Sequence, residues 1–502
     1  RPAVAAAEMP AQVLLSALAA ARPRVCVVGA GAGGLIAARM LREIADVIVY
    51  EKEAAVGGVW RVGAPVLYAG LITNLPKQIM AFRDSPFPPT PPGTPSFVSA
   101  AAVGAYLETY ARQHNLGGCI RLNCPVESVR RVVRGPTHER RVWQVRAGGS
   151  DMDEEFDAII VANGHYNLPS YADLPGAASF PNRIMHSCEY DAPEPFIAQT
   201  VLCIGARSSG TDVAREICEA GGRRTLTADR ACHATETSPT NDRLLRTPPV
   251  AELLPDGGVR FEDGHVEPNV DVVIHCVGYE YDFPFLRDAT VPLDAPGAAS
   301  GMHSLRGEDG HTARQGRLPL SVGGRRVAPL FEHLFHVDDP SLAFLGIPHS
   351  VVPFPLMEVQ ATLVARVLQG RANLPDAAAR RAWLTGYEAG LSRLKDAHHL
   401  GNAQWDYCRR LLQMAGVADP DWETAISVNE AVYNHVGPQR PQFPGAADSY
   451  RALEFEVDHL MGRWLCVNDG AGGEVRREAK LASEAKCEAV GASGMAVKAS
   501  SS

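Results

Sequence analysis

The residues with the clearest chemical signature in this sequence are glycines, and the chemistry they indicate is phosphate binding. The apolar run Val25–Val28 leads into a turn in which Gly29, Gly31 and Gly34 have G-x-G-x-x-G spacing. Such a turn brings the main chain close to a pyrophosphate, which then faces the positive N-terminus of a helix. Glu51 ends a second apolar run and can accept hydrogen bonds from a ribose. These features predict a dinucleotide site, rather than a glycine turn without a ligand, built from Gly29, Ala30, Gly31, Ala32, Gly33, Gly34 and Glu51.

A second turn of the same kind follows the apolar run Thr200–Ile204. It consists of Gly205, Ala206, Arg207, Ser208, Ser209 and Gly210, so that an arginine replaces the middle glycine. The side chain of Arg207 restricts the approach of the main chain, but its guanidinium can bind a phosphate, and both serines can donate to phosphate oxygens. The turn therefore predicts a second dinucleotide site. A degenerate nucleotide fold that no longer binds is the alternative.

Three further places are expected to contact these dinucleotides. Gly58 and Trp60 suit a main chain packed against a flat ring system, although a turn with a core tryptophan is the alternative. Val126 opens a predicted strand and is expected near the adenine of the first dinucleotide. Arg230, downstream of Arg223 and Arg224, offers a cation where the 2′-phosphate of NADPH would lie, while Asp229 argues against that preference over NADH.

The elements around the two turns predict an α/β fold. Apolar runs predict parallel strands, and helical spacing predicts the helices between them. The expected strands cover 25–28, 46–50, 156–162, 200–204, 271–277 and 342–348, with helices at 35–44, from Ser99, at 212–220 and at 358–368. Residues 125–134 and 141–146 alternate like an antiparallel pair, and 287–318 is expected to be a loop-like insertion. This order predicts two Rossmann-like domains, the second inserted into a discontinuous first domain.

Composition narrows the class of protein. A length of 502 residues suggests two or three domains, and a net charge of −9 gives no general attraction to nucleic acid or anionic membrane. No apolar stretch is long enough for a membrane span. The eleven cysteines include no C-x-x-C, which predicts reduced thiols in a cytoplasmic protein. An organelle is the alternative if the alanine-rich residues 1–22 are the remnant of a transit peptide. The histidines form no cluster typical of a metal site.

The residues above occur in the order found in flavin-containing monooxygenases, and the chain resembles that family from Pro23 to Phe455. The segment Y-A-G-L-I-T-N-L-P-K at 68–77 is similar to the plant members, including the S-oxygenases of glucosinolate metabolism. Phe180, His186 and Tyr190 match the family fingerprint F-x-G-x-x-x-H-x-x-x-F/Y, in which Asn182 stands in place of glycine. Tyr190 also separates the chain from Baeyer–Villiger relatives, which usually carry tryptophan there.

The resemblance implies an NADPH-dependent flavin monooxygenase. NADPH would reduce FAD, and oxygen would add to the flavin as a C4a-hydroperoxide that transfers its distal oxygen to a thioether sulfur or an amine nitrogen of a small molecule. Asn74 matches the family's active-site asparagine and is expected to hold both the hydroperoxide and the nicotinamide side. His186 is expected to have a structural role. The membrane anchor of the animal members has no counterpart here, and we allow for a homodimer.

The domain boundaries follow from this interpretation: 1–22, an extension; 23–168 and 327–460, the two parts of the FAD domain; 169–282, the NADPH domain; 283–326, a linker or insertion; and 467–502, a disordered tail. Two other functions remain open. One is a Baeyer–Villiger or N-hydroxylating flavin monooxygenase. The other is a non-catalytic flavin-binding protein with a decayed NADPH site, which Arg207 and Asn182 would favour.

Overall fold

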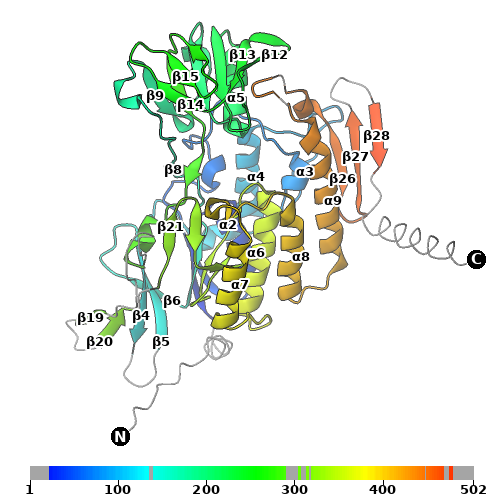
Figure 1. Cartoon of the computed structure of the whole chain (residues 1–502). Coiled ribbons are helices and arrows are strands. Elements are labelled where there is room, and N and C mark those ends of the chain that lie inside the picture. Colours follow the sequence, from blue (N-terminus) through cyan, green and yellow to red (C-terminus); the bar gives the residue numbers. More distant parts are fainter. Residues whose placement is uncertain are drawn as a thin grey trace, which may run out of the picture.

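The chain forms two lobes joined by a narrow connection (Figure 1). The structure, a computed structural model, describes residues 22–134, 140–289, 303–306, 312–315, 318–441, 443–446, 448–468 and 474–478. The larger lower lobe contains both ends of the described chain, and the smaller upper lobe is formed by its middle part. The predicted extension at 1–22 lies almost wholly outside the described residues.

The lower lobe is built on a mostly parallel sheet that joins strands far apart in the sequence. In spatial order its strands are β23 (Leu330–Phe331), β24 (Phe335–His336), β25 (Leu342–Phe344), β7 (Ala158–Val161), β1 (Arg24–Val28), β2 (Asp46–Tyr50) and β3 (Ile120–Arg121). β1 pairs in parallel with β2 and β7, and β7 pairs in parallel with β25. The sheet therefore takes strands from before and after the upper lobe, which confirms the predicted insertion.

The upper lobe repeats this plan on a smaller scale. Its sheet has the order β12 (Glu236–Ser238), β13 (Asn241–Thr247), β11 (Arg224–Ala228), β10 (Thr200–Ile204), β17 (Val272–His275) and β9 (Arg183–His186). β10 pairs in parallel with β11 and β17, as β1 does with its neighbours. A small antiparallel sheet of β14 (Val250–Leu253), β15 (Val259–Phe261) and β16 (Val266–Glu267) completes the lobe. The α/β class with two Rossmann-like units is thus confirmed.

Two antiparallel strands, β8 (Leu168–Pro169) and β18 (Tyr279–Glu280), carry the chain into and out of the upper lobe. Side chains strengthen this connection: Asn163 donates to Asp282 O at 3.1 Å, and Ser170 donates to Glu280 at 3.0 Å. His186 is buried nearby, and both its ring nitrogens are engaged, with Gly278 O and the main-chain N–H of Cys188. Asn182 donates to Val270 O at 2.8 Å, so this replacement for glycine is accommodated.

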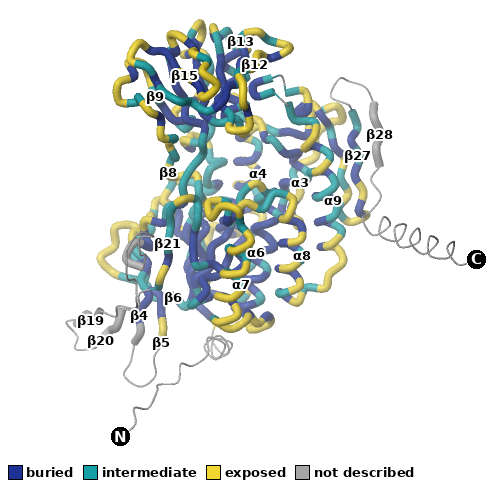
Figure 2. Tube along the Cα trace, viewed as in Figure 1, coloured by how far each residue is buried: buried dark blue, intermediate teal, exposed yellow. Residues whose placement is uncertain are grey.

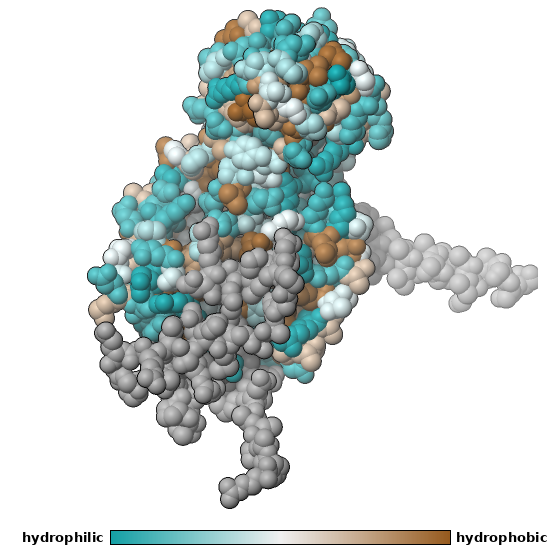
Figure 3. Space-filling model, turned by 60° about the vertical axis from the view of Figure 1, so that its left-hand side comes forward, coloured by the Kyte–Doolittle hydropathy of each residue, from teal (hydrophilic) through white to brown (hydrophobic). Residues whose placement is uncertain are grey.

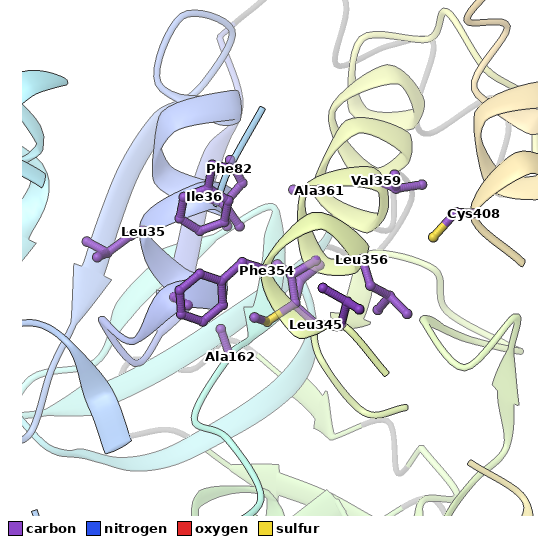
Figure 4. Close-up of a cluster of buried hydrophobic side chains, with 14 of the residues drawn as sticks. Leu35, Ile36, Phe82, Ala162, Leu345, Phe354, Leu356, Val359, Ala361 and Cys408 are labelled. Carbon is purple, nitrogen blue, oxygen red and sulfur yellow. The ribbon is translucent and has the colours of Figure 1, made fainter. Parts of the chain in front are cut away.

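Helices cover the lower sheet and form the core with it. They are α2 (Ala32–Leu41), α3 (Lys77–Met80), α4 (Ala100–Gln113), α6 (Pro353–Leu368), α7 (Ala377–Ala389), α8 (Gln404–Met414) and α9 (Pro420–Val436), while α5 (Ser208–Glu219) belongs to the upper lobe. Burial is concentrated in the strands and on the inner faces of these helices (Figure 2). In Figure 4, Ile36 of α2 and Phe354 of α6 lie between the two helices. Both side chains are apolar and fully or nearly fully buried, so their contact stabilises the packing of the helices.

The remaining strands extend beyond the predicted pattern. A five-stranded antiparallel sheet has the order β19 (His303–Arg306), β20 (Thr312–Gln315), β4 (Val126–Arg134), β5 (Arg140–Ala147) and β6 (Glu154–Phe156). The segment expected to be a loop at 287–318 therefore supplies two of its strands. β26 (Phe455–Asp458), β27 (Arg463–Asn468) and β28 (Glu474–Glu478) continue into the predicted tail, and β21 (Ser321–Gly323) pairs with β22 (Arg326–Ala328). The rest of the tail lies outside the described residues.

The described surface gives no sign of a membrane-crossing element. None of the described helices combines the length and the apolar run that a bilayer crossing requires. On the face shown in Figure 3, apolar residues of the described part occur in small groups among polar ones.

Candidate functional site

The first glycine turn lies between β1 and α2 and cannot tolerate side chains at two of its positions. Gly29 has φ +99°, and a Cβ there would lie 2.7 Å from Ala162 O on β7's continuation. A Cβ on Gly34 would lie only 1.8 Å from Gly29 O. Both glycines are therefore required by the close contact of strand, turn and helix.

The segment around Gly58 covers the middle of this turn. Gly57 N donates to Ala30 O at 3.0 Å, and a Cβ on Gly58 would lie 2.9 Å from the Cα of Gly31. The short 3₁₀ helix Gly58–Trp60 follows, and the half-buried Trp60 lies beside α4. The structure thus brings together the predicted contacts Gly31, Gly58 and Trp60.

Glu51 follows the last residue of β2 and lies directly beside the turn. It is buried, its Oε2 accepts from Ala30 N at 2.6 Å, and its Oε1 accepts from Glu53 N at 2.9 Å. Each carboxylate oxygen has a second lone pair, so the side chain can also accept from a ribose hydroxyl. The main-chain oxygen of Glu51 accepts from Cys124 N at 2.8 Å, which places the half-exposed Val126 close to this strand end.

Two helix N-termini are left without side-chain caps at the two turns. α2 begins after Gly31 and α5 after Arg207, and neither N-cap residue accepts a side-chain hydrogen bond. Elsewhere in the described part of the chain, Ser99 caps α4 and Asp376 caps α7, whereas α3, α6 and α8 also lack a side-chain cap. Free N–H groups and the helix dipole at α2 and α5 suit phosphate oxygens. The residues present therefore fit the pyrophosphates of FAD and of a nicotinamide dinucleotide.

The second turn has the same main-chain conformation as the first. Gly205 has φ +107°, and a Cβ on Gly210 would lie 1.8 Å from Gly205 O. Arg207 has φ −88° and ψ −174°, an extended conformation that any residue adopts, and its side chain is exposed. The arginine at the middle position is therefore accommodated without strain.

The electrostatic surroundings of His349 include groups from separate segments of the chain. Burial, with smaller contributions from His399, His165, Arg207 and Arg325, lowers the pKa of His349 to about 4. Arg325 also donates to the main-chain oxygen of Val277, which lies two residues after the end of β17. These groups come from both lobes and from segments far apart in the chain, so no local pattern in the sequence indicated that they would meet. An anionic ligand would be favoured there.

Asn74 lies where the lobes meet. Its side-chain Nδ2 donates to Ser208 Oγ, at the start of α5, at 3.2 Å. Its main-chain oxygen accepts from Arg440 at 3.0 Å, and Thr73 is held by hydrogen bonds with Leu75 O and Val98 N. The structure therefore places the half-buried amide of Asn74 next to the second turn, on a loop fixed by main-chain contacts.

A buried ion pair joins the lobes one helical turn further along α5. Arg451 binds both carboxylate oxygens of Asp212 at 2.9 and 3.0 Å, and its Nε donates to Thr73 O at 3.2 Å. Tyr68 donates to Asp212 at 3.0 Å, and Arg451 also pairs with Asp448. Sequence reasoning missed this network, because its members come from distant segments. It ties α5 directly to the main chain before Asn74.

The charged residues expected near a 2′-phosphate lie at two opposite ends of β11. Asp229 is paired with Arg246 of β13 through two hydrogen bonds of 3.0 and 2.6 Å, so its charge is compensated. Arg230 is exposed beside it. Arg223 and Arg224 lie at the opposite, amino end of β11, where they pair with Asp271 and Glu267.

The other reactive side chains are structural in character. No group of His, Cys, Asp and Glu among the described residues could hold a metal ion. The buried Cys26, Cys203 and Cys408 are free thiols, and burial raises the pKa of Cys408 to about 12. Such thiols are poor nucleophiles. The arrangement is thus suited to binding two dinucleotides rather than to catalysis by a side-chain nucleophile.

Comparisons with known proteins agree with this geometry. Residues 22–234 match the family model described as flavin-binding monooxygenase-like. The chain is 32% identical over 470 residues to the flavin-containing monooxygenase FMO GS-OX5 of Arabidopsis thaliana, covering 87% of this chain and 92% of that protein. It is similar to the structure of S-allyl-L-cysteine S-oxygenase from Allium sativum, with 30% identity, a TM-score of 0.71 and coverage of 86% and 95%. Tmm from Pelagibacter sp. strain HTCC7211 shares the fold at 19% identity and a TM-score of 0.65, covering 88% and 95%.

Proposed function

The chain belongs to the flavin-containing monooxygenase family, and we propose that it uses NADPH and oxygen to oxygenate a thioether sulfur or an amine nitrogen of a small molecule. FAD and NADPH are its cofactors. When bound, FAD supplies the redox chemistry and the activation of oxygen, so no side-chain nucleophile is needed. The observation that carries the proposal is the hydrogen bond from Asn74 to Ser208, because it supports a role for one neutral amide beside the second dinucleotide turn.

In this proposal the lower turn holds FAD. Gly29–Gly34 and the N-terminus of α2 bind its pyrophosphate, and Glu51 accepts from the ribose. Val126 lies toward the adenine, while Gly58 and Trp60 line the path to the ring system. The close approach of Gly58 to Gly31 leaves main chain rather than side chain against the cofactor.

The upper turn holds NADPH. Gly205–Gly210 and the N-terminus of α5 bind its pyrophosphate, with Arg207, Ser208 and Ser209 as donors. Arg230 takes the 2′-phosphate, which the pairing of Asp229 with Arg246 makes electrostatically acceptable. These charges favour NADPH over NADH.

Asn74 is the catalytic residue of the proposal. Its amide offers two N–H donors and one acceptor, so it can orient the nicotinamide and donate to oxygen at the flavin edge at the same time. The Arg440 and Arg451 contacts fix the loop and thereby the direction of the amide. Soft nucleophiles need no general base, since a thioether sulfur has no proton to lose. The S-oxygenase relative from Allium sativum supports a thioether as the first substrate to test.

The test is Asn74→Ser, with the exposed Asn402→Ser as a matched control. We expect Asn74→Ser to keep bound FAD and to lose oxide product by about 100-fold, the usual effect of removing one aligned donor. Asn402→Ser should behave like the unaltered protein. Product formed at the full rate by Asn74→Ser would remove this residue from the catalytic role. A screen of thioethers and amines by mass spectrometry would decide between sulfur and nitrogen.

A further inference from the structure

The lower lobe contains a cavity that the proposed reaction does not use. It has a volume of about 390 Å³ and lies between α3, α6, α8, α9, β26 and the proline-rich loop at 86–95. None of the residues assigned to FAD or NADPH lines it. Leu356 and Val359 of α6, and Cys408 of α8, form part of its wall, and Figure 4 shows them on the facing sides of these two helices. Its volume is in the range of small-molecule sites, roughly 300–1,000 Å³.

One buried charged group in this wall is a lysine that pairs with no described acidic side chain. Lys77 is only 5% exposed, and its Nζ donates to Pro88 O at 3.1 Å and to Thr90 Oγ1 at 2.9 Å. Among the described residues it forms no salt bridge, and its ammonium has three donors. Burial lowers its pKa, as expected for a cation that lacks a counter-charge. One donor is thus left for an anion.

A second buried charged group is a carboxyl. The wall also includes Arg83, Glu454, Glu456 and His459, all more exposed than these two groups. Glu358 of α6 is 2% exposed, and its Oε2 accepts from Arg83 N at 2.8 Å. Burial raises the pKa of Glu358 to about 7. The guanidinium of Arg83 does not compensate it by a salt bridge, since that group pairs with Asp419 and lies over the ring of Trp422. Oε1 of Glu358 is therefore available to a cationic or neutral donor.

The rest of the wall is suited to an apolar body with polar ends. Its rings belong to Phe82, Phe87, Trp405, Trp422 and Phe455. Trp405 Nε1 and Gln78 Oε1 are buried and have no hydrogen-bond partner within the part of the chain that the structure describes. The orientation of the Gln78 amide is determined, because its nitrogen donates to Phe455 O, which can only accept. Burying such groups without partners is costly, and a polar ligand would relieve that cost after small side-chain shifts.

We propose that this cavity is a second small-molecule site, which binds a zwitterion of the α-amino-acid class with an apolar or aromatic side chain. Its carboxylate pairs with Lys77, its ammonium pairs with Glu358, and its side chain packs among the rings. No salt bridge joins Lys77 to Glu358, so each can take one end of the ligand. A ligand with only one charge would leave the other buried group uncompensated, which sets the expected selectivity.

The test is calorimetric titration of the FAD-loaded protein, without NADPH, with three matched compounds: L-phenylalanine, phenethylamine and 3-phenylpropanoate. We expect L-phenylalanine to bind at least 10-fold more tightly than either singly charged analogue. Lys77→Met should remove the advantage over phenethylamine, and Glu358→Gln the advantage over 3-phenylpropanoate. The exposed residues provide the controls Lys52→Met and Glu43→Gln, which should change nothing.

Saturating NADP⁺ distinguishes this cavity from the cofactor cleft, because it should leave the affinity for L-phenylalanine unchanged. Displacement by NADP⁺, equal affinity for the three compounds, or no binding at all would overturn the proposal. If a variant does not load FAD, the three-compound comparison on the unaltered protein and the NADP⁺ competition still decide the question.

Discussion

The two glycine turns share a main-chain conformation and differ in what faces their middle residue. The first glycines have φ +99° and +107°, and a Cβ on either last glycine would lie 1.8 Å from a carbonyl oxygen. Gly31 and Arg207 have nearly the same torsion angles, φ −74°, ψ −171° and φ −88°, ψ −174°. Only the neighbour differs: Gly58 covers Gly31, whereas Arg207 faces outward.

The comparison shows that the three glycines of the motif serve separate purposes. The first and last are required by torsion angle and by the close packing of helix on strand. At the middle position the second segment of main chain limits the size of the side chain. A Cβ on Gly31 would lie 3.4 Å from the Cα of Gly58, at ordinary contact distance, and a longer side chain would meet that segment. The upper turn lacks that cover and can carry a cation there instead. Arg207 is therefore no sign of decay.

The largest effects should come from the last glycines. Gly34→Ala and Gly210→Ala each place a methyl group inside contact distance of a carbonyl, which costs about 3 kcal/mol or more. We expect Gly34→Ala to lose FAD, and Gly210→Ala to keep FAD but lose NADPH binding. Flavin absorbance of the purified proteins and titration with NADP⁺ measure both. Loss of FAD from Gly210→Ala would contradict the assignment of the turns.

The next largest effect should come from breaking the ion pair between Asp212 and Arg451, which joins the lobes. Arg451→Met leaves Asp212 buried without its cation, which should cost about 3–5 kcal/mol of stability. It also releases Thr73 O beside Asn74, so product formation per NADPH consumed should fall. Thermal unfolding and the ratio of oxide to NADPH oxidised test the two parts, with the exposed Arg463→Met as control. An unchanged ratio would show that Asn74 is positioned without this contact.

The stability of the protein should depend on pH through Glu358, a buried carboxyl of the lower lobe. The folded pKa of Glu358 is about 7, above its unfolded value of 4.5, so the folded state binds the proton more tightly. The stabilisation that Glu358 provides is therefore fully present below pH 4.5 and is lost as the pH rises to about 7. Above that pH, the free energy of unfolding is lower by about 3 kcal/mol. Glu358→Gln should therefore be more stable than the unaltered protein at pH 8 but not at pH 5. Denaturant unfolding at the two pH values measures this, and parallel curves would contradict it.

The smallest effect concerns the choice of nicotinamide cofactor. Removing one exposed cation from a phosphate contact should weaken binding by about 10-fold, or roughly 1.4 kcal/mol. Arg230→Ala should therefore weaken NADPH and spare NADH, whereas Arg207→Ala should weaken both, because the pyrophosphate is common to them. Steady-state KM values for the two cofactors give the comparison. Equal losses for Arg230→Ala would place the 2′-phosphate elsewhere.

The sequence predicted those parts of the fold that local pattern controls. The strand at 46–50 and the strand at 200–204 have the predicted bounds, and Ser99 caps α4 as its position suggested. Boundaries at the turns were less accurate, since α5 begins at Ser208 rather than Asp212. Glycine and serine have low helix propensity, but the packing of the turn against β10 starts the helix there.

The sequence could not predict what depends on contacts between distant segments. The strands at 303–306 and 312–315 pair with each other and extend the sheet at β4. Their segment is polar and rich in glycine, and for that reason we expected it to be a loop. The Asp212–Arg451 pair spans 239 positions, and the groups that lower the pKa of His349 come from both lobes. Residues that meet in this way have no characteristic spacing in the sequence. Motifs therefore located the turns and Asn74, while the partners that hold them appeared only in the folded chain.

The central claim is that the two turns bring NADPH and FAD together beside Asn74. Anaerobic stopped-flow mixing of the FAD-loaded protein with NADPH tests it directly, since the flavin absorbance reports hydride transfer. The account predicts rapid bleaching of the flavin without added substrate, slower bleaching with NADH, and none in Gly210→Ala. A flavin that NADPH leaves oxidised in the unaltered protein would contradict it.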